Sequence, residues 1–66
     1  MQVFINGAPH DCAAGCTLAA LLDQAGIEQS TCATAVNGVF VPRNARKEKL
    51  LSDKDQVMTF EPITGG

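Results

Sequence analysis

The side chains best suited to chemistry are three cysteines and one histidine, and their spacing predicts no reactive centre. His10, Cys12 and Cys16 could supply three zinc ligands, but a closed structural site needs four, and the C-x2-C spacing typical of such sites is missing. Cys16 alone lies beside a predicted helix start, where thiols become reactive; we interpret it as an incidental small residue. No pattern typical of a Ser/His/Asp set, a phosphate loop or paired catalytic carboxylates is present. We therefore expect no metal site and no catalytic residue.

The last two residues, Gly65 and Gly66, form a second chemical feature. Because they have no side chains, the terminal carboxylate could pass through a channel too narrow for other residues. That carboxylate is ionised at neutral pH and is a poor electrophile. Only an activating enzyme that uses ATP could make it accept sulfur or transfer an acyl group. On its own a terminal Gly-Gly is a weak signal, since flexible chain ends are common.

Length and charge exclude further classes of function. The 66 residues leave room for one small domain. A chain of this size buries only about 60% of the surface that its unfolded form exposes, and enzymes usually place their pockets in larger cores, so we do not expect an autonomous enzyme. Seven acidic residues against five basic ones give a net charge of −2, whereas nucleic-acid binding needs several basic side chains on one face. We expect protein partners instead.

The sequence also indicates a cellular compartment. It has no signal-peptide pattern and no apolar run approaching ~20 residues, so we expect neither secretion nor a membrane span. Three cysteines cannot all pair within the chain, whereas small secreted domains carry an even number. We therefore expect reduced thiols in the cytoplasm.

One helix and a small sheet are predicted to form the body of the domain. Two Asn-Gly dipeptides, at positions 6–7 and 37–38, are strong β-hairpin signals because both residue types tolerate positive φ. Apolar residues at i, i+3, i+4 and i+7 from Leu18 predict a helix of about two turns that Thr17 caps and Gly26 ends. The result is an α+β arrangement, with strands over residues 2–6, 9–12, 33–37, 39–41 and 56–61.

The connections between these elements are expected to be a linker and short turns. Residues 28–32 are predicted to be a polar linker, and residues 53–55 a turn. Residues 43–51 are charged, and we expect a turn or a single helical turn there, anchored by Leu50 and Leu51.

Alternation along the strands assigns side chains to the two faces of the sheet. One helix can cover only one face, and the aliphatic set is predicted to face it: Val3, Ile5, Val39, Val41, Val57 and Thr59. The uncovered face then carries Phe4, Phe40, Met58 and Phe60, which would mark a protein interface. The alternative is that a bulge or register shift places some of these phenylalanines in the core, and for Phe60 the two alternatives are nearly balanced.

With its predicted sheet and helix, its uncovered apolar face and its terminal Gly-Gly, the chain resembles the ThiS-type sulfur carriers of thiamine biosynthesis, a ubiquitin-like β-grasp family. The resemblance spans essentially the whole chain. It is carried by segments that appear in the family's order: the first strand Met1-Gln2-Val3-Phe4-Ile5-Asn6, Cys12-Ala13-Ala14-Gly15 followed by Thr17-Leu18, Val36-Asn37-Gly38, Val41-Pro42-Arg43, Phe60, and Ile63-Thr64-Gly65-Gly66.

The resemblance implies a fold and a carrier role. It implies a β-grasp domain over residues 1–61, with a mixed sheet of four to five strands on one helix, and a flexible tail over residues 62–66. Gly66 would be adenylated and converted to a thiocarboxylate, while Gly65 and Thr64 would give the tail access to partner sites. Phe4, Phe40, Met58 and Phe60 would dock the activating enzyme, with the family match supporting Phe40 and Phe60 more firmly than Phe4.

The resemblance also implies partners. They are an E1-like, ThiF-type adenylating enzyme that consumes ATP, a cysteine-desulfurase sulfur relay, and a ThiG-type thiazole synthase. The carrier itself would hold no cofactor, bind neither nucleic acid nor membrane, and be a monomer when free. Three alternatives stay open: a molybdopterin-type carrier, a ubiquitin-like protein modifier, and a β-grasp interaction module whose Gly-Gly is incidental.

One position departs from the family pattern. The family often has Gly between the two acidic residues before the last strand, and here Lys54 stands between Asp53 and Asp55. If this position needs positive φ, the lysine adds strain of about 1 kcal/mol.

Overall fold

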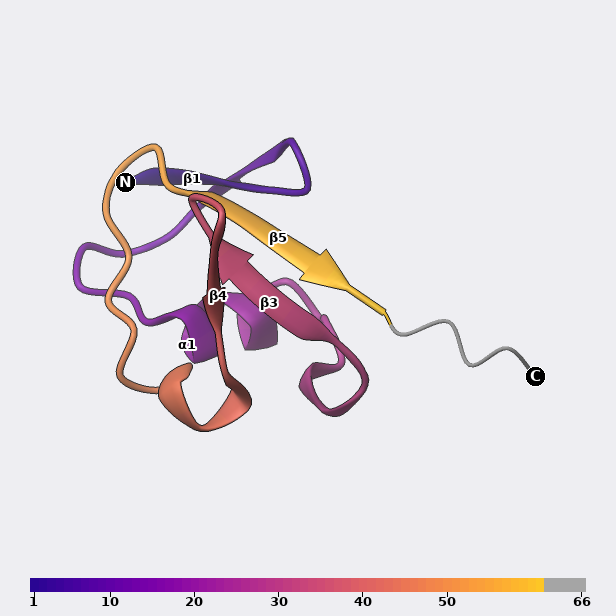
Figure 1. Cartoon of the computed structure of the whole chain (residues 1–66). Coiled ribbons are helices and arrows are strands. Elements are labelled where there is room, and N and C mark those ends of the chain that lie inside the picture. Colours follow the sequence, from indigo (N-terminus) through magenta and orange to yellow (C-terminus); the bar gives the residue numbers. More distant parts are fainter. Residues whose placement is uncertain (62–66) are drawn as a thin grey trace.

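A computed structural model describes residues 1–61. These residues form five strands, one α-helix and two short 3₁₀ helices (Figure 1). In chain order they are β1 (Gln2–Ile5), β2 (Ala8–Asp11), α1 (Leu18–Gln24), η1 (Gln29–Thr31), β3 (Ala33–Val36), β4 (Val39–Val41), η2 (Arg43–Ala45) and β5 (Gln56–Phe60). No helix among these residues is both long and apolar enough to span a membrane.

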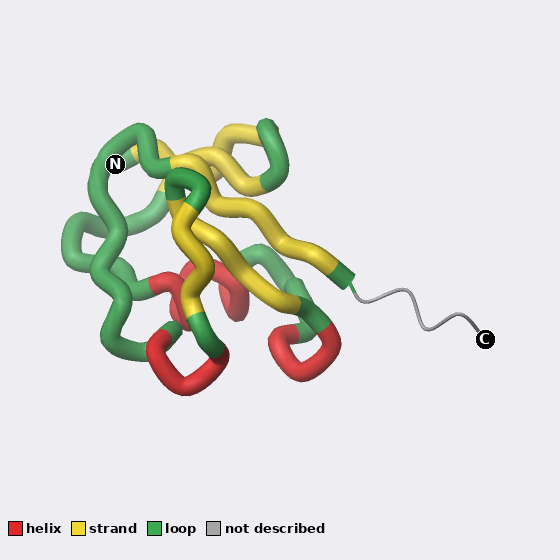
Figure 2. The backbone as a smooth tube through the Cα atoms, viewed as in Figure 1, coloured by secondary structure: helices red, strands yellow, loops and turns green. Residues whose placement is uncertain are grey.

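The five strands form one mixed sheet in the order β2-β1-β5-β3-β4. The first and last strands, β1 and β5, pair in parallel at the centre, and the other neighbours are antiparallel. The sheet is covered by α1 on one face (Figures 1 and 2). The predicted α+β class and the mixed sheet on one helix are confirmed, with five strands.

The helix forms where the apolar spacing predicts it, and a distant segment completes its first turn. Thr17 Oγ1 accepts a hydrogen bond from the Ala20 N–H at 3.2 Å. The N–H groups of Leu18 and Ala19 donate to the carbonyls of Lys49 (2.8 Å) and Arg46 (3.0 Å). The free donors that begin every helix are thus satisfied partly by residues far along the chain.

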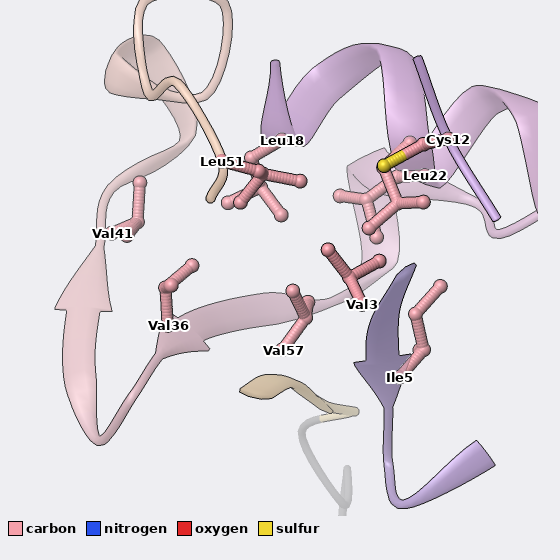
Figure 3. Close-up of a cluster of buried hydrophobic side chains, with 10 residues drawn as sticks. Val3, Ile5, Cys12, Leu18, Leu22, Val36, Val41, Leu51 and Val57 are labelled. Atoms are coloured by element: carbon pink, nitrogen blue, oxygen red, sulfur yellow. The ribbon is translucent and has the colours of Figure 1, made fainter. Parts of the chain in front are cut away.

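The core lies between α1 and the sheet (Figure 3). Leucines of the helix stripe meet aliphatic side chains from one face of the strands, and one cysteine and one leucine close the edges. Its buried members are Val3, Ile5, Cys12, Leu18, Leu21, Leu22, Val36, Val41, Leu51 and Val57.

Both predicted hairpin turns form, and both also hold the last strand. Asn6 and Asn37 have φ of 50° and 52°, as the Asn-Gly turns require. The Asn6 Oδ1 accepts a hydrogen bond from the Thr59 N–H at 3.0 Å. The Asn37 Oδ1 accepts one from the Gln56 N–H at 2.9 Å. The two turns therefore fix β5 near both of its ends, which the dipeptide signal alone does not reveal.

Two predicted connections differ in the structure. The expected linker over residues 28–32 contains η1, which Glu28 caps. The Glu28 carboxylate accepts hydrogen bonds from the Ser30 N–H (3.2 Å) and from the Ser30 hydroxyl (2.8 Å). These hydrogen bonds lower the pKa of the Glu28 carboxyl. Over residues 43–51, the predicted helical turn is η2, but only one of the two leucine anchors is buried.

Leu51 is in the core, whereas Leu50 is 62% exposed, so the prediction for Leu50 is wrong. The physical reason is the extended backbone of this segment. Leu50 forms a β-bridge with Thr17, and the Leu51 N–H donates to the Cys16 carbonyl at 3.0 Å. Neighbouring side chains of an extended chain point to opposite sides, so only one leucine can enter the core.

Arg46 is a buried cation that the sequence patterns did not indicate, since basic residues are mostly solvent-exposed. Only 2% of it is exposed. Its guanidinium donates to the Thr34 hydroxyl (3.0 Å), the Gln29 carbonyl (2.8 Å) and the Cys32 carbonyl. One side chain therefore joins η2 to η1 and β3.

Candidate docking face

The strand register places the predicted aromatic residues on the face of the sheet that α1 does not cover. Directly paired residues share a face of the sheet. Ala35 of β3 pairs with Phe40 on one side and Met58 on the other. Ala33, on the same face as Ala35, pairs with Phe60. We call Phe40, Met58 and Phe60 the aromatic face.

The aromatic face is exposed and continuous. Phe40 is 65% exposed, Phe60 49% and Met58 44%. Ala35, which lies between Phe40 and Met58, is nevertheless buried, because the two larger side chains cover its small methyl group. The core alternative for Phe40 and Phe60 is therefore wrong. Burying each aromatic ring against a partner is worth about 1.5–3 kcal/mol.

Phe4 lies on the same face but at its margin. It pairs with Gln56 of β5 and with Pro9 of β2, one step along β5 from Met58. It is half-buried, whereas the aromatic face is largely open. The structure thus groups Phe40, Met58 and Phe60 and leaves Phe4 beside them.

Val39 is where the assignment of faces fails. Strand alternation puts it with Val41 on the helix side, and Val41 is buried, but Val39 is 66% exposed. Val39 stands on β4, the outermost strand, and the seven-residue helix α1 is too short to cover that corner. Val39 lines a surface hollow with Val36, Val41, Pro42 and Ala45 instead of entering the core.

The aromatic face reaches the end of the described chain. Phe60 is the last residue of β5, and with Arg43, Glu61 and residues 30–33 it lines a second hollow. The Arg43 guanidinium donates to the Ser30 carbonyl at 2.7 Å, so a positive charge is held beside the point where the chain leaves the sheet. The sequence patterns assigned Arg43 no contact, because only the fold brings it to β5.

The other predicted site residues are Thr64, Gly65 and Gly66, and all three lie outside the described residues. Within residues 1–61, no group of three or more His, Cys, Asp or Glu side chains could hold a metal ion. The described part of the chain therefore offers an exposed apolar surface that ends at Phe60.

Comparisons with known proteins agree along the whole chain. The sequence profile of the ThiS family matches residues 3–66. The sulfur carrier protein ThiS of Escherichia coli (strain K12) is 38% identical over 66 residues, which is all of both chains. The crystal structure of a thiamine biosynthesis protein (ThiS) from Geobacter metallireducens superposes with a TM-score of 0.86 at 25% identity, again over all of both chains. The predicted ubiquitin-like β-grasp fold is confirmed, and the chain belongs to the ThiS family.

Proposed function

We propose that this protein is a sulfur carrier of thiamine biosynthesis, a carrier rather than an enzyme, with the sulfur held on the carboxylate of Gly66. The observation that carries the proposal is the end-to-end match to the ThiS family, which includes the terminal Gly65-Gly66. The aromatic face supports it, because it ends at Phe60, the strand residue from which the chain continues to the tail.

The chemistry follows from the poor reactivity of a carboxylate. In an E1-like, ThiF-type partner, the Gly66 carboxylate attacks ATP and becomes an acyl adenylate, with release of pyrophosphate. The acyl carbon is then electrophilic. A cysteine-desulfurase relay delivers the sulfur as a persulfide, whose outer sulfur attacks the acyl carbon and displaces AMP. A second thiol then attacks the S–S bond of the resulting acyl disulfide, which leaves a thiocarboxylate on Gly66 and a disulfide between the two attacking thiols. A ThiG-type thiazole synthase receives this sulfur.

The body of the domain would position the tail for these partners. Five residues follow Glu61 and can extend over at most about 17 Å, so the domain must dock close to each active site. The aromatic face offers the contact for that docking. Arg43, held by the Ser30 carbonyl beside Phe60 and Glu61, offers a charged contact at the base of the tail. Gly65 and Thr64 would let the tail enter a narrow channel.

The test is the intact mass of the protein after incubation with a ThiF-type enzyme, ATP and a sulfur source. We expect one oxygen to be replaced by sulfur, with Gly66 as the modified residue in the C-terminal peptide. Omitting ATP must abolish the change. An unchanged mass, or normal thiamine synthesis by cells whose carrier lacks Gly66, would contradict the proposal. Stable conjugates on lysines of other proteins would indicate a protein modifier instead.

A further inference from the structure

Two of the three thiols lie against each other at one end of the core. Cys12 is a buried member of the core cluster, and Cys16 packs against that cluster from outside. Figure 3 shows the Cys12 side chain beside Leu22 of α1. Burial raises the pKa of the Cys12 thiol, and the nearby Cys16 thiol raises that pKa further. The Cys16 thiol donates its own hydrogen bond to the Thr17 carbonyl at 3.4 Å. The two thiols therefore lie at the same end of the core, although four positions separate them in the sequence.

The backbone between them explains why they meet. The Cys16 N–H donates to the Ala13 carbonyl at 3.0 Å and closes a tight turn, in which Gly15 takes a φ of +83°. Such a turn brings its first and last residues, here Ala13 and Cys16, to within about 7 Å. Cys12 directly precedes the turn, so the chain at Cys16 comes back toward Cys12. A disulfide needs Cα atoms about 4.4–6.8 Å apart, and a reversal of the chain between two cysteines favours such an approach.

Both ends of the turn are held by the fold. Cys12 exchanges two backbone hydrogen bonds with Met1: its N–H donates to the Met1 carbonyl at 2.9 Å, and its carbonyl accepts from the terminal amine at 2.8 Å. The Cys16 carbonyl accepts from the Leu51 N–H at 3.0 Å. The backbone at both cysteines is therefore fixed by contacts with other parts of the fold.

We propose that Cys12 and Cys16 form a reversible intrachain disulfide, which makes the loop between β2 and α1 a site of oxidative modification. The oxidant is a low-molecular-weight disulfide. Cys16 is the more exposed thiol, and its thiolate attacks one sulfur of the oxidant, which releases the first small thiol. Cys12 then loses its proton, and its sulfur attacks the sulfur of Cys16 and displaces the second small thiol. Two protein thiols are oxidised, and one disulfide is reduced to two thiols.

The third cysteine does not compete for either partner. Cys32 is buried, and its carbonyl accepts a hydrogen bond from Arg46. Among the described residues, it is not a member of the core cluster that holds Cys12. The pairing is therefore specific, and it ties the end of β2 to the residue before the helix cap Thr17. The aromatic face lies on the other side of the sheet from the core that contains Cys12.

The test treats the reduced, folded protein with oxidised glutathione, blocks the remaining thiols with N-ethylmaleimide under denaturing conditions, and records the intact mass. We expect the loss of two hydrogen atoms and the addition of one maleimide. Cleavage after Glu28 then separates Cys12 and Cys16 from Cys32, and the maleimide must lie on the peptide that contains Cys32. Dithiothreitol must restore three reactive thiols.

The variants Cys16→Ala and Cys32→Ala form a matched pair. Cys32→Ala should still lose two hydrogen atoms and then accept no maleimide. Cys16→Ala should not form the intrachain bond and should keep two reactive thiols. Circular dichroism checks that each variant is folded, and the peptide map of the wild-type protein needs no variant. A glutathione adduct that persists on Cys16, a bond to Cys32, or three free thiols after treatment would overturn the proposal.

Discussion

Both faces of the sheet carry apolar side chains, yet the two faces serve opposite purposes. On the covered face, Val3 and Val57 are almost fully buried against α1, whereas on the other face Phe40 and Phe60 stay largely exposed. The strand register that buries one set exposes the other, because side chains alternate across each strand. In so small a domain, one face holds the fold together and the other remains available to a partner.

This comparison shows that hydrophobicity alone does not identify core residues. The largest apolar side chains of this protein, its phenylalanines, lie outside the core. A single helix covers only one face of a sheet, and the seven residues of α1 do not extend to the far corner at Val39. Substitutions on the two faces should therefore affect different properties: stability on the covered face and partner binding on the open one.

Leu21→Ala should cause a large loss of stability, because Leu21 is fully buried in the core cluster. Truncation of a buried leucine costs about 2–5 kcal/mol. Urea denaturation followed by circular dichroism measures the loss. Leu50→Ala is the matched control: its side chain is exposed, and we expect a change within about 0.5 kcal/mol. Equal losses for the two variants would contradict the assignment of Leu21 to the core.

Phe40→Ala and Phe60→Ala should weaken binding and leave the fold intact. If each ring is buried by the activating partner, its loss costs about 1.5–3 kcal/mol, which corresponds to a Kd about 10- to 150-fold higher. Calorimetric titration with the ThiF-type enzyme measures this effect. Phe4→Ala, at the margin of the face, is the comparison and should raise the Kd less. A loss of several kcal/mol in the free energy of unfolding for Phe40→Ala would show that the two faces are not separate.

Arg46→Lys should lower the free energy of unfolding by about 1–3 kcal/mol. A lysine keeps the positive charge but lacks the planar fork that reaches three acceptors, on η1, on β3 and at Cys32 between them. At least one buried carbonyl or hydroxyl is then left without a donor. Arg43→Lys is the control, since Arg43 makes one exposed hydrogen bond to the Ser30 carbonyl. A smaller loss for Arg46→Lys than for Arg43→Lys would contradict the structural role of Arg46.

Local signals predicted most of the fold, and long-range contacts account for what they missed. The hairpins depend on Asn-Gly dipeptides and the helix on Thr17 and its leucine spacing, so short segments contain the information. Leu50 is different, because its exposure depends on the bridge to Thr17. Arg46 is different for the same reason, since its acceptors lie 12 to 17 positions away.

For the candidate site too, local rules predicted some features, and features that depend on the whole fold were missed. Strand alternation correctly placed Phe40, Met58 and Phe60 on the uncovered face, because alternation is a local rule. It failed at Val39, because the position of a strand in the sheet and the length of the covering helix are properties of the whole fold. The hollow beside Phe60 was not predicted, because one of the residues that line it is Arg43, which lies far from Phe60 in the sequence.

Lys54→Gly should stabilise the protein slightly, by about 0.5–1 kcal/mol. Lys54 has a φ of +72°, as anticipated from the glycine that the family often has there, and a side chain in this region is strained whereas glycine is not. The greater freedom of glycine in the unfolded chain offsets part of the gain. Urea denaturation of Lys54→Gly beside Lys47→Gly makes the test. Lys47 is exposed and does not have positive φ, so its replacement should stabilise nothing. If the two variants respond alike, the lysine at position 54 adds no strain, and the turn before β5 tolerates it for another reason.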